Sequence, residues 1–401
     1  MKGWRRADGR KGIRNHVAVA YLVECAHHVA REIAWPYRDT GRAGAAHAIG
    51  FPGCYPNAYA AKVMQRLCTH PNVGAVLLVS LGCEGFNKRS LERAIRDSGR
   101  PVMTLTIQDD GGTRSTIDKG RAWVEAQLGE LAAQPAEPMA VSELVVGTIC
   151  GGSDATSGLT ANPAMGRAFD FLVAEKAAAI FEETGELIGM EDWMAARAVT
   201  PELGEEIKAC VAKAARYYET LGYPSFAPGN ADGGLTTIEE KSLGAYAKSG
   251  ASPISGIIKP GDIPPRGGLY LLDVVPDGEV RFGFPNISDN AEIVELIACG
   301  SHLILFSTGR GSVVGSALAP VIKVCANPRT YDRMAEDMDV NAGRILTGEA
   351  DLDTVGREIF DLIRQVAGGA PSKSEALGHQ KFILTYKSFS PLGPACLPAV
   401  A

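Results

Sequence analysis

The chain has 401 residues, 46% of them hydrophobic and 21% charged, which suits about two or three folded domains and excludes a disordered chain. Its formal net charge of −6 argues against nucleic acid as a partner. The sequence contains no apolar run of the roughly 18 residues that a membrane span needs and no signal-peptide core, so no membrane partner is expected. Its nine cysteines show no close pairing, and we expect a cytoplasmic protein with reduced thiols.

Apolar runs rich in β-branched residues alternate with segments of helical period in the first part of the chain. In chain order these are a strand over 17–23, helices over 27–34 and 57–68, a strand over 75–81, a helix over 88–98, a strand over 102–107 and a helix over 113–133. Such alternation predicts a parallel sheet that is covered by helices on both faces.

Two prolines in Gln134-Pro-Ala-Glu-Pro138 break the helical pattern and predict a boundary. Further strands are predicted over 144–149, 177–182, 269–275, 302–306 and 321–324. Helices are predicted over 163–173, in the segment that ends at Tyr218, and over 290–299. The prediction is therefore an α/β protein of two Rossmann-like lobes with mainly parallel sheets. We divide it into an N-terminal lobe, 1–138, and a C-terminal lobe, 139–401, with an extended C-terminal tail.

Glycine-rich loops follow several of the predicted strands. They are Gly53-Cys54, Leu81-Gly-Cys83-Glu84-Gly85, Ile149-Cys150-Gly-Gly-Ser153-Asp154 and Ser307-Thr-Gly309-Arg310-Gly-Ser312. In an open parallel sheet, ligands bind outside the carboxyl ends of the strands, where loops and helix N-termini present backbone N–H groups. These loops therefore suggest one shared cleft.

Three cysteines, Cys54, Cys83 and Cys150, lie in such loops, whereas the other cysteines that we assign fall within apolar periodic segments. A thiolate in a glycine loop can be exposed and can bind a metal. The alternative is that small residues are needed at tight turns. The spacing leaves both interpretations open, because it lacks the close Cys-x-x-Cys pattern of a zinc site.

The segment 229–244 predicts a glycine loop followed by a helix that Thr236 or Thr237 caps. A capped helix is the simple interpretation. Lys241, with Glu239 or Glu240 near the helix start, could also transfer a proton to or from a bound substrate.

Cationic groups accompany several of these loops. Arg310 offers a guanidinium beside backbone donors and could hold a carboxylate or phosphate. Thr113 and Arg114, at a helix start, form a weaker cradle of the same kind. The basic residues between Arg5 and Arg14 are interpreted as a solvated surface or as an arm that attracts an anionic substrate.

Six motifs, in this order, resemble those of the altronate/galactarate dehydratase family of sugar-acid hydro-lyases. They are RRADGRKGIRNHVAV, LGCE, GGTRSTIDKG, CGGSDATSGLTANPAMG, PGNADGGLTTIEEKSLG and LFSTGRGS. The resemblance extends from about Gly3 to about Gly348, and the CGGSD block is its most specific part.

The resemblance implies that the protein removes water from a polyhydroxy acid to give a 2-keto-3-deoxy acid. It also implies Fe²⁺ or a related divalent metal such as Mn²⁺, which stabilises the enediolate that forms when the C2 proton leaves. An iron–sulfur cluster bound by the three loop cysteines is the alternative to a single divalent metal ion. The residues implied are, for the metal, Cys54, Cys83 and Cys150; for catalysis, Lys241, Glu240 and Glu84; and for the substrate, Arg310, Gly309, Ser153, Asp154, Asn162, Thr113, Arg114 and Asn230.

The chain departs from the family pattern in two places. Members commonly carry a small N-terminal β-rich domain of the SAF type, whereas this chain begins at the RRADGR motif. A separate small SAF-domain subunit is therefore an expected partner, together with assembly into a homo-oligomer. The family often has His-Thr-Tyr-Gly-Cys where this chain has Gly50-Phe-Pro-Gly-Cys54, and the tail FILTYKSFSPLGPACLP also differs, which puts altronate as the substrate in doubt.

Two other functions stay open. Sulfolactate sulfo-lyase large subunits resemble the same family, and the expulsion of sulfite needs the same C2 proton abstraction. The Gly-Cys-Glu form of the second motif favours the dehydratase. A subunit without catalytic activity is the other alternative.

Overall fold

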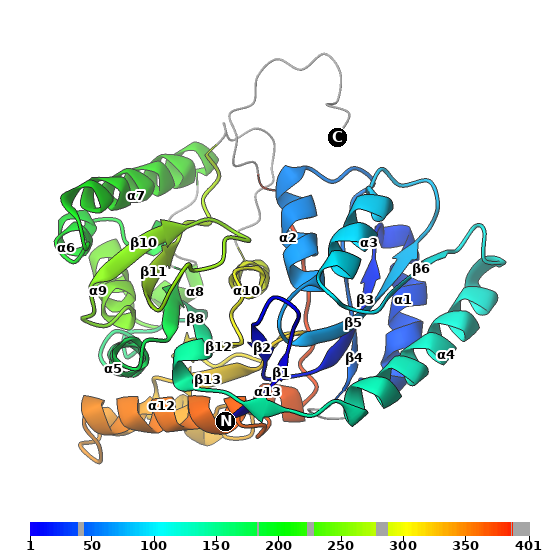
Figure 1. Ribbon diagram of the computed structural model, residues 1–401. Coiled ribbons are helices and arrows are strands. Elements are labelled where there is room, and N and C mark those ends of the chain that lie inside the picture. Colours follow the sequence, from blue (N-terminus) through cyan, green and yellow to red (C-terminus); the bar gives the residue numbers. More distant parts are fainter. Residues whose placement is uncertain (39–43, 183, 223–227, 278–287, 386, 388–401) are drawn as a thin grey trace.

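The computed structural model describes residues 1–38, 44–182, 184–222, 228–277, 288–385 and 387. It contains two parallel sheets covered by helices, which confirms the predicted α/β class (Figure 1). In the described part of the chain no helix is long and apolar enough to cross a membrane.

The smaller sheet has four parallel strands in the order β4-β3-β5-β6. Its strands are β3 (His16–Tyr21), β4 (Ala46–Gly50), β5 (Val73–Ser80) and β6 (Val102–Thr106). The helices of this lobe are α1 (His27–Ala34), α2 (Ala58–Cys68), α3 (Lys88–Asp97) and α4 (Gly112–Ala133). Each of the four helices was predicted from its period, whereas β4 was not predicted.

The larger sheet has seven parallel strands in the order β10-β11-β9-β8-β12-β13-β14. These are β8 (Val145–Cys150), β9 (Ala178–Phe181), β10 (Ile254–Ile258), β11 (Gly268–Leu272), β12 (Leu303–Thr308), β13 (Val321–Cys325) and β14 (Val340–Asn341). Every residue of β12 and β13 is buried, as expected when helices cover both faces of a parallel sheet.

The helices of the larger lobe cover both faces of its sheet. They are α5 (Ala161–Ala174), α6 (Glu191–Ala195), α7 (Pro201–Leu221), α8 (Pro228–Asp232), α9 (Ile238–Lys248), α10 (Asp289–Ala298), α11 (Pro328–Arg333), α12 (Leu352–Ala367) and α13 (Lys373–Ala376). The sequence predicted α5, α7, α9 and α10, but not α12. On one face α5 packs against both α9 and α12.

The two lobes share a hydrophobic core. Helix α10 packs on β8 and also on α2 of the smaller lobe, and it lies between the two lobes in the view of Figure 1. One continuous cluster of buried residues joins Phe51 and Val63 of the smaller lobe to Ile293 and Phe306 of the larger one. The predicted boundary near residue 138 lies in β7 (Glu137–Pro138), which pairs with the N-terminal strand β1 (Lys2–Arg5).

The basic N-terminal segment is partly buried, and its interpretation as a solvated surface is wrong for Arg6 and Arg14. Strand β1 pairs with β2 (Lys11–Gly12) in an antiparallel hairpin. Arg6 is buried and donates to the carbonyl of Pro71 over 2.7 Å. Arg14 is also buried, and its guanidinium binds the Glu375 carboxylate at 2.7 Å and 2.8 Å. These arginines fasten the segment to the body of the protein.

Candidate active site

The candidate site lies where the order of strands in the larger sheet reverses. Strand β8 comes first in this lobe and pairs with β9 on one side and with β12 on the other. Helical connections therefore leave the sheet in opposite directions at this point, and in open parallel sheets this is where ligands bind, in the crevice outside the carboxyl ends of the two strands. The loops of the CGGSD and STGRGS motifs both begin here.

The two glycine loops are joined through their backbones. Gly151 N–H donates to the Ser307 carbonyl at 3.1 Å, and the N–H groups of Gly309 and Arg310 donate to the Gly152 carbonyl at 3.1 Å and 2.9 Å. The structure thus confirms that these two predicted loops converge. Because their carbonyls and N–H groups bond one another, the geometry of the crevice floor is fixed by the backbone.

Lys241 is the centre of a cluster of side chains at this crevice. Helix α9 begins after Thr237, whose hydroxyl accepts the N–H of Glu240, as the sequence predicts. The Lys241 side chain is 6% exposed. Its Nζ lies 3.1 Å from Cys150 Sγ, 3.0 Å from Ser153 Oγ and 2.9 Å from Glu186 Oε1. Residues from two separate segments, the CGGSD loop and the segment after β9, therefore surround one amine on α9.

Glu186 is a member of this cluster that the sequence did not identify. It lies in a short 3-10 helix, η4 (Thr184–Glu186), just beyond the carboxyl end of β9. One carboxylate oxygen pairs with Lys241, and the other lies 3.5 Å from Cys150 Sγ. The signal in the sequence was its place after the predicted strand 177–182, at the same sheet edge as the CGGSD loop.

Asp289, the first residue of α10, is a second acid that the sequence did not identify. Its carboxylate lies directly over Gly151, where a Cβ would collide with it, so a glycine is required at that position. Burial, and then repulsion by Glu186, raise the pKa of Asp289 to about 6, although the charges of Lys241 and Lys248 oppose the rise. A carboxyl group with this pKa can exchange a proton near neutral pH.

Several of the predicted substrate-binding residues form hydrogen bonds that hold the loops together. Asp154 is buried and accepts hydrogen bonds from Thr156 N–H at 2.9 Å and from Asn327 Nδ2 at 3.0 Å. Asn162 accepts from the Ser307 hydroxyl at 2.7 Å and donates to the Gly244 carbonyl of α9 at 3.1 Å. Asn162 thereby positions the helix that carries Lys241.

The 229–234 segment packs against the CGGSD loop, as expected of two motifs that build one site. Asn230 is buried and donates to the Ser153 carbonyl at 2.9 Å, while Ala155 N–H donates to the Gly233 carbonyl at 3.1 Å. Arg310 is half-exposed, donates to the Gly229 carbonyl and lies 3.9 Å from the Asp232 carboxylate. The guanidinium thus stands at the edge of the crevice.

The remaining predicted residues lie elsewhere. Glu240 is exposed, and its carboxylate caps α9 by accepting the Thr236 N–H at 2.7 Å. Glu84 accepts the Gly82 N–H at 2.8 Å in the smaller lobe and also bonds the Ser80 hydroxyl. Thr113 and Arg114 are exposed at the start of α4, in that same lobe. The structure therefore brings Lys241, but neither Glu240 nor Glu84, into the Cys150 cluster.

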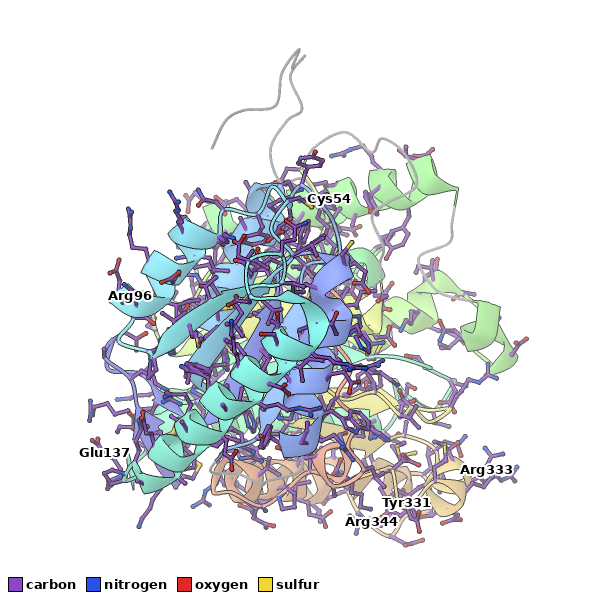
Figure 2. All side chains as sticks on the ribbon, turned by 90° about the vertical axis from the view of Figure 1, so that its right-hand side faces the viewer. Cys54, Arg96, Glu137, Tyr331, Arg333 and Arg344 are labelled. Atoms are coloured by element: carbon purple, nitrogen blue, oxygen red, sulfur yellow. The ribbon has the colours of Figure 1, made fainter. Side chains whose placement is uncertain are left out.

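The three loop cysteines do not form one ligand set. Cys54 and Cys83 are exposed in the smaller lobe, where the Cys54 carbonyl accepts the Gly85 N–H at 2.8 Å, whereas Cys150 is buried in the larger lobe. Figure 2 shows Cys54 at the end of the molecule opposite Tyr331 and Arg344. Among the described residues, no three His, Cys, Asp or Glu side chains gather closely enough to hold a metal ion. The ammonium group beside Cys150 also disfavours a further cation at that sulfur.

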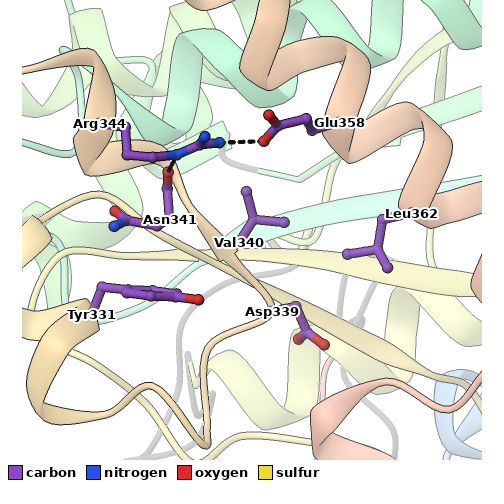
Figure 3. A pocket seen from close by; sticks show the side chains of 7 residues that line it. All are labelled: Tyr331, Asp339, Val340, Asn341, Arg344, Glu358 and Leu362. Atoms are coloured by element: carbon purple, nitrogen blue, oxygen red, sulfur yellow. Dashed lines mark hydrogen bonds and ion pairs between the residues drawn. The ribbon is translucent and has the colours of Figure 1, made fainter. Parts of the chain in front are cut away.

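A pocket of about 360 Å³ lies at the far edge of the larger sheet and contains none of the predicted site residues (Figure 3). Its lining comes from α11, β14, the 3-10 helix η5 (Ala342–Ile345) and α12, and includes Tyr331, Asn341 and the ion pair between Arg344 and Glu358. It is separate from the crevice at β8 and β12.

The fold and the crevice define a class of protein. A buried lysine, a thiol and two acids at the switch point of a parallel sheet are typical of an α/β enzyme that moves protons on a small polar substrate. The chain belongs to the D-galactarate/altronate dehydratase family. The model for the C-terminal domain of that family matches residues 141–390, and the model for its second domain matches residues 3–132.

Named relatives agree with this membership, which makes the chain an enzyme of a lyase family. It is 34% identical over 96% of both chains to the (2R)-sulfolactate sulfo-lyase subunit beta of Chromohalobacter salexigens. It is 32% identical to the galactarate dehydratase (L-threo-forming) of Escherichia coli, over 92% of this chain and 73% of the relative. The altronate dehydratase of Bacillus subtilis is 29% identical, over 95% of this chain and 75% of the relative.

Proposed function

We propose that the chain is a hydro-lyase that removes water from a small hydroxy or sugar acid and forms a 2-keto-3-deoxy acid. The observation that carries this proposal is the cluster of Lys241, Cys150, Ser153 and Glu186, with Asp289 beside it, at the switch point of the larger sheet. Dehydration needs a base for the C2 proton and an acid for the departing hydroxyl group, and this cluster contains candidates for both.

Asp289 is the proposed base. With its pKa at about 6 it is mostly ionised at neutral pH, yet it remains basic enough to accept a proton efficiently. Its position over Gly151 directs the carboxylate at the floor of the crevice, where the substrate would lie.

Lys241 is the proposed acid. The ion pair with Glu186, at 2.9 Å, favours the ammonium form, which can give a proton to the departing hydroxyl group. The two remaining neighbours, Cys150 and Ser153, limit the directions in which the amine can point, because each lies within 3.1 Å of Nζ. The glycine loops and Arg310 offer donors for the substrate carboxylate.

A divalent metal, Fe²⁺ or Mn²⁺, remains part of the proposal on the strength of the family. Such an ion would act as a Lewis acid on the substrate oxygens. The described residues do not form a ligand set for it, so the steps above depend on protein groups alone. Metal analysis of Cys54→Ser, Cys83→Ser and Cys150→Ser tests the sites that the resemblance implies: unchanged metal content and turnover in all three would remove the cysteines from that role.

The proposal is tested with the full chain purified without oxygen and assayed for keto-acid formation on a panel of aldonic, aldaric and sulfo-hydroxy acids. Glu186→Gln and Glu240→Gln form a matched pair of variants. The first removes the carboxylate that pairs with Lys241, whereas the second changes an exposed residue that caps α9. We expect Glu186→Gln to lose most activity and Glu240→Gln to retain it. Equal activity of the two variants on an active substrate would contradict the assigned site.

A carbon–sulfur lyase is the second candidate, and one observation favours it. The match to the sulfo-lyase subunit covers 96% of both chains, whereas each dehydratase compared above has about a quarter of its length outside the match. Release of sulfite with the keto acid would identify this activity. Because that relative is named as a β subunit, we also propose a small partner subunit, which co-purification from the native host would reveal. A homo-oligomer is proposed as well, and its mass in solution tests it.

A further inference from the structure

A buried ion pair lies at the far end of α10 from Asp289. Lys387 Nζ is 2.9 Å from Glu295 Oε2, and the two side chains are 1% and 0% exposed. The other carboxylate oxygen of Glu295 accepts a hydrogen bond of 2.5 Å from the Tyr59 hydroxyl group. Burial of two charges is costly, and here each oxygen of the carboxylate has a partner.

The three partners come from three parts of the protein. Tyr59 belongs to α2 of the smaller lobe, Glu295 belongs to α10, and Lys387 belongs to the C-terminal segment. The Lys387 carbonyl also accepts the side-chain amide of Asn57, the N-cap of α2, at 2.8 Å. The C-terminal segment therefore fastens α10 to the smaller lobe.

The charge of Lys387 acts on more than one acid. Burial alone would lower the pKa of Lys387, but the Glu295, Glu292 and Glu182 carboxylates outweigh it and raise this pKa. Asp289, Glu292 and Glu295 lie three residues apart on α10, so each is a neighbour of the next along a rise of about 9 Å. Lys387 pairs with Glu295, and the same helix carries Asp289 at the candidate site.

We propose that Lys387 is a positioning residue for the elimination reaction: by pairing with Glu295 it fixes α10, and with it the Asp289 carboxyl group, against the glycine loop 151–153. This inference rests on the proposed function. The lysine is part of the FILTYKSFS segment, which lies at the C-terminal end of the region that the family model matches and has no place in the proposed chemistry itself.

The experiment compares Lys387→Met, Lys387→Arg and Lys381→Met in the full chain. Lys381 is a matched control because it is an exposed lysine directly before that segment. We expect Lys387→Met to lower kcat about 10- to 100-fold, because a small displacement of a catalytic group has effects of this size, while KM changes little. Lys387→Arg should recover most of the loss, and Lys381→Met should match the parent protein. If Lys387→Met has the parent kcat even though its Tm falls, the lysine is only structural and the proposal is wrong.

Tyr59→Phe gives a milder change in case Lys387→Met does not fold. It removes the hydrogen bond that the Tyr59 hydroxyl group donates to Glu295. This change should lower kcat by a smaller factor than Lys387→Met does, at constant KM, and an unchanged kcat would count against the proposal. Hydrogen exchange separates this inference from the proposed function, since it needs no substrate. Faster exchange at residues 289–292 in Lys387→Met supports positioning, and exchange equal to that of the parent protein there refutes it even if the chain has no lyase activity.

Discussion

Replacement of Asp289 by asparagine should lower activity and raise stability at the same time. The pKa of this carboxyl group rises from 3.8 to about 6 in the folded protein, which corresponds to about 3 kcal/mol of destabilisation once the group is ionised in both states. Since the side chain keeps partial exposure, we discount the gain in the free energy of unfolding of Asp289→Asn at pH 7 to about 1–2 kcal/mol.

The direction of this pKa shift determines how stability and activity change with pH. Between pH 4 and pH 6 the folded protein holds the Asp289 proton more tightly than the unfolded chain does, so this group makes the protein less stable as pH rises through that range. Asp289→Asn has no titrating group at this position, so the loss of stability between pH 4 and pH 6 should be smaller in this variant. In kinetics, the parent enzyme should lose kcat/KM as pH falls through about 6, because the base becomes protonated.

Urea unfolding at pH 5 and pH 7 and the pH profile of kcat/KM measure both effects. We expect Asp289→Asn to reduce kcat/KM about 10²- to 10⁴-fold, the usual contribution of general base catalysis, and to abolish the acidic limb. If Asp289→Asn keeps the acidic limb of the pH profile, Asp289 is not the base. If the variant is less stable than the parent protein at pH 7, the ionised Asp289 does not destabilise the fold.

Other predictions concern the lysine, the loop and a buried histidine. Lys241→Met should lower kcat/KM by at least about 100-fold, whereas Lys208→Met, on a partly exposed lysine outside the cluster, should not, and similar rates for both would contradict the proposed acid. Gly309→Ala places a Cβ against the buried Asp154 carboxylate and should cost about 1–3 kcal/mol in urea unfolding, while Gly129→Ala, with open space, should be neutral or slightly stabilising; equal effects would disprove the close approach. Burial lowers the pKa of His302 to about 4, so this histidine takes up a proton at a higher pH in the unfolded chain than in the folded protein. The free energy of unfolding should therefore fall as pH drops from about 6.5 to 4, by up to about 3 kcal/mol. His302→Gln should flatten that part of the curve of unfolding free energy against pH, and a curve that keeps its slope would rule the histidine out.

The local elements were predictable because each depends on neighbouring residues. The predicted helix over 27–34 coincides with α1, and of the two threonines predicted as the cap of α9, Thr236 or Thr237, the structure has Thr237. Prediction failed where local signals were weak or were overridden: β4 was not predicted, and Arg6 and Arg14, interpreted as part of a solvated surface, are buried against backbone carbonyls and Glu375. A charged side chain is buried only when partners exist, and those partners are distant in the sequence.

The sequence alone predicted the α/β class and the convergence of the glycine loops at Cys150 and Gly309, since glycines after buried strands are local features; it also placed the loops at Cys54 and Cys83 in the same cleft, which is wrong. Only the tertiary structure decided that Glu186 and Asp289 join Lys241 there, that Glu240 is a helix cap, and that Cys54 and Cys83 lie apart from Cys150. The physical reason is that strand order and helix packing, rather than spacing along the chain, set which side chains meet. The pairing of Lys387 with Glu295 across 92 residues is of the same kind.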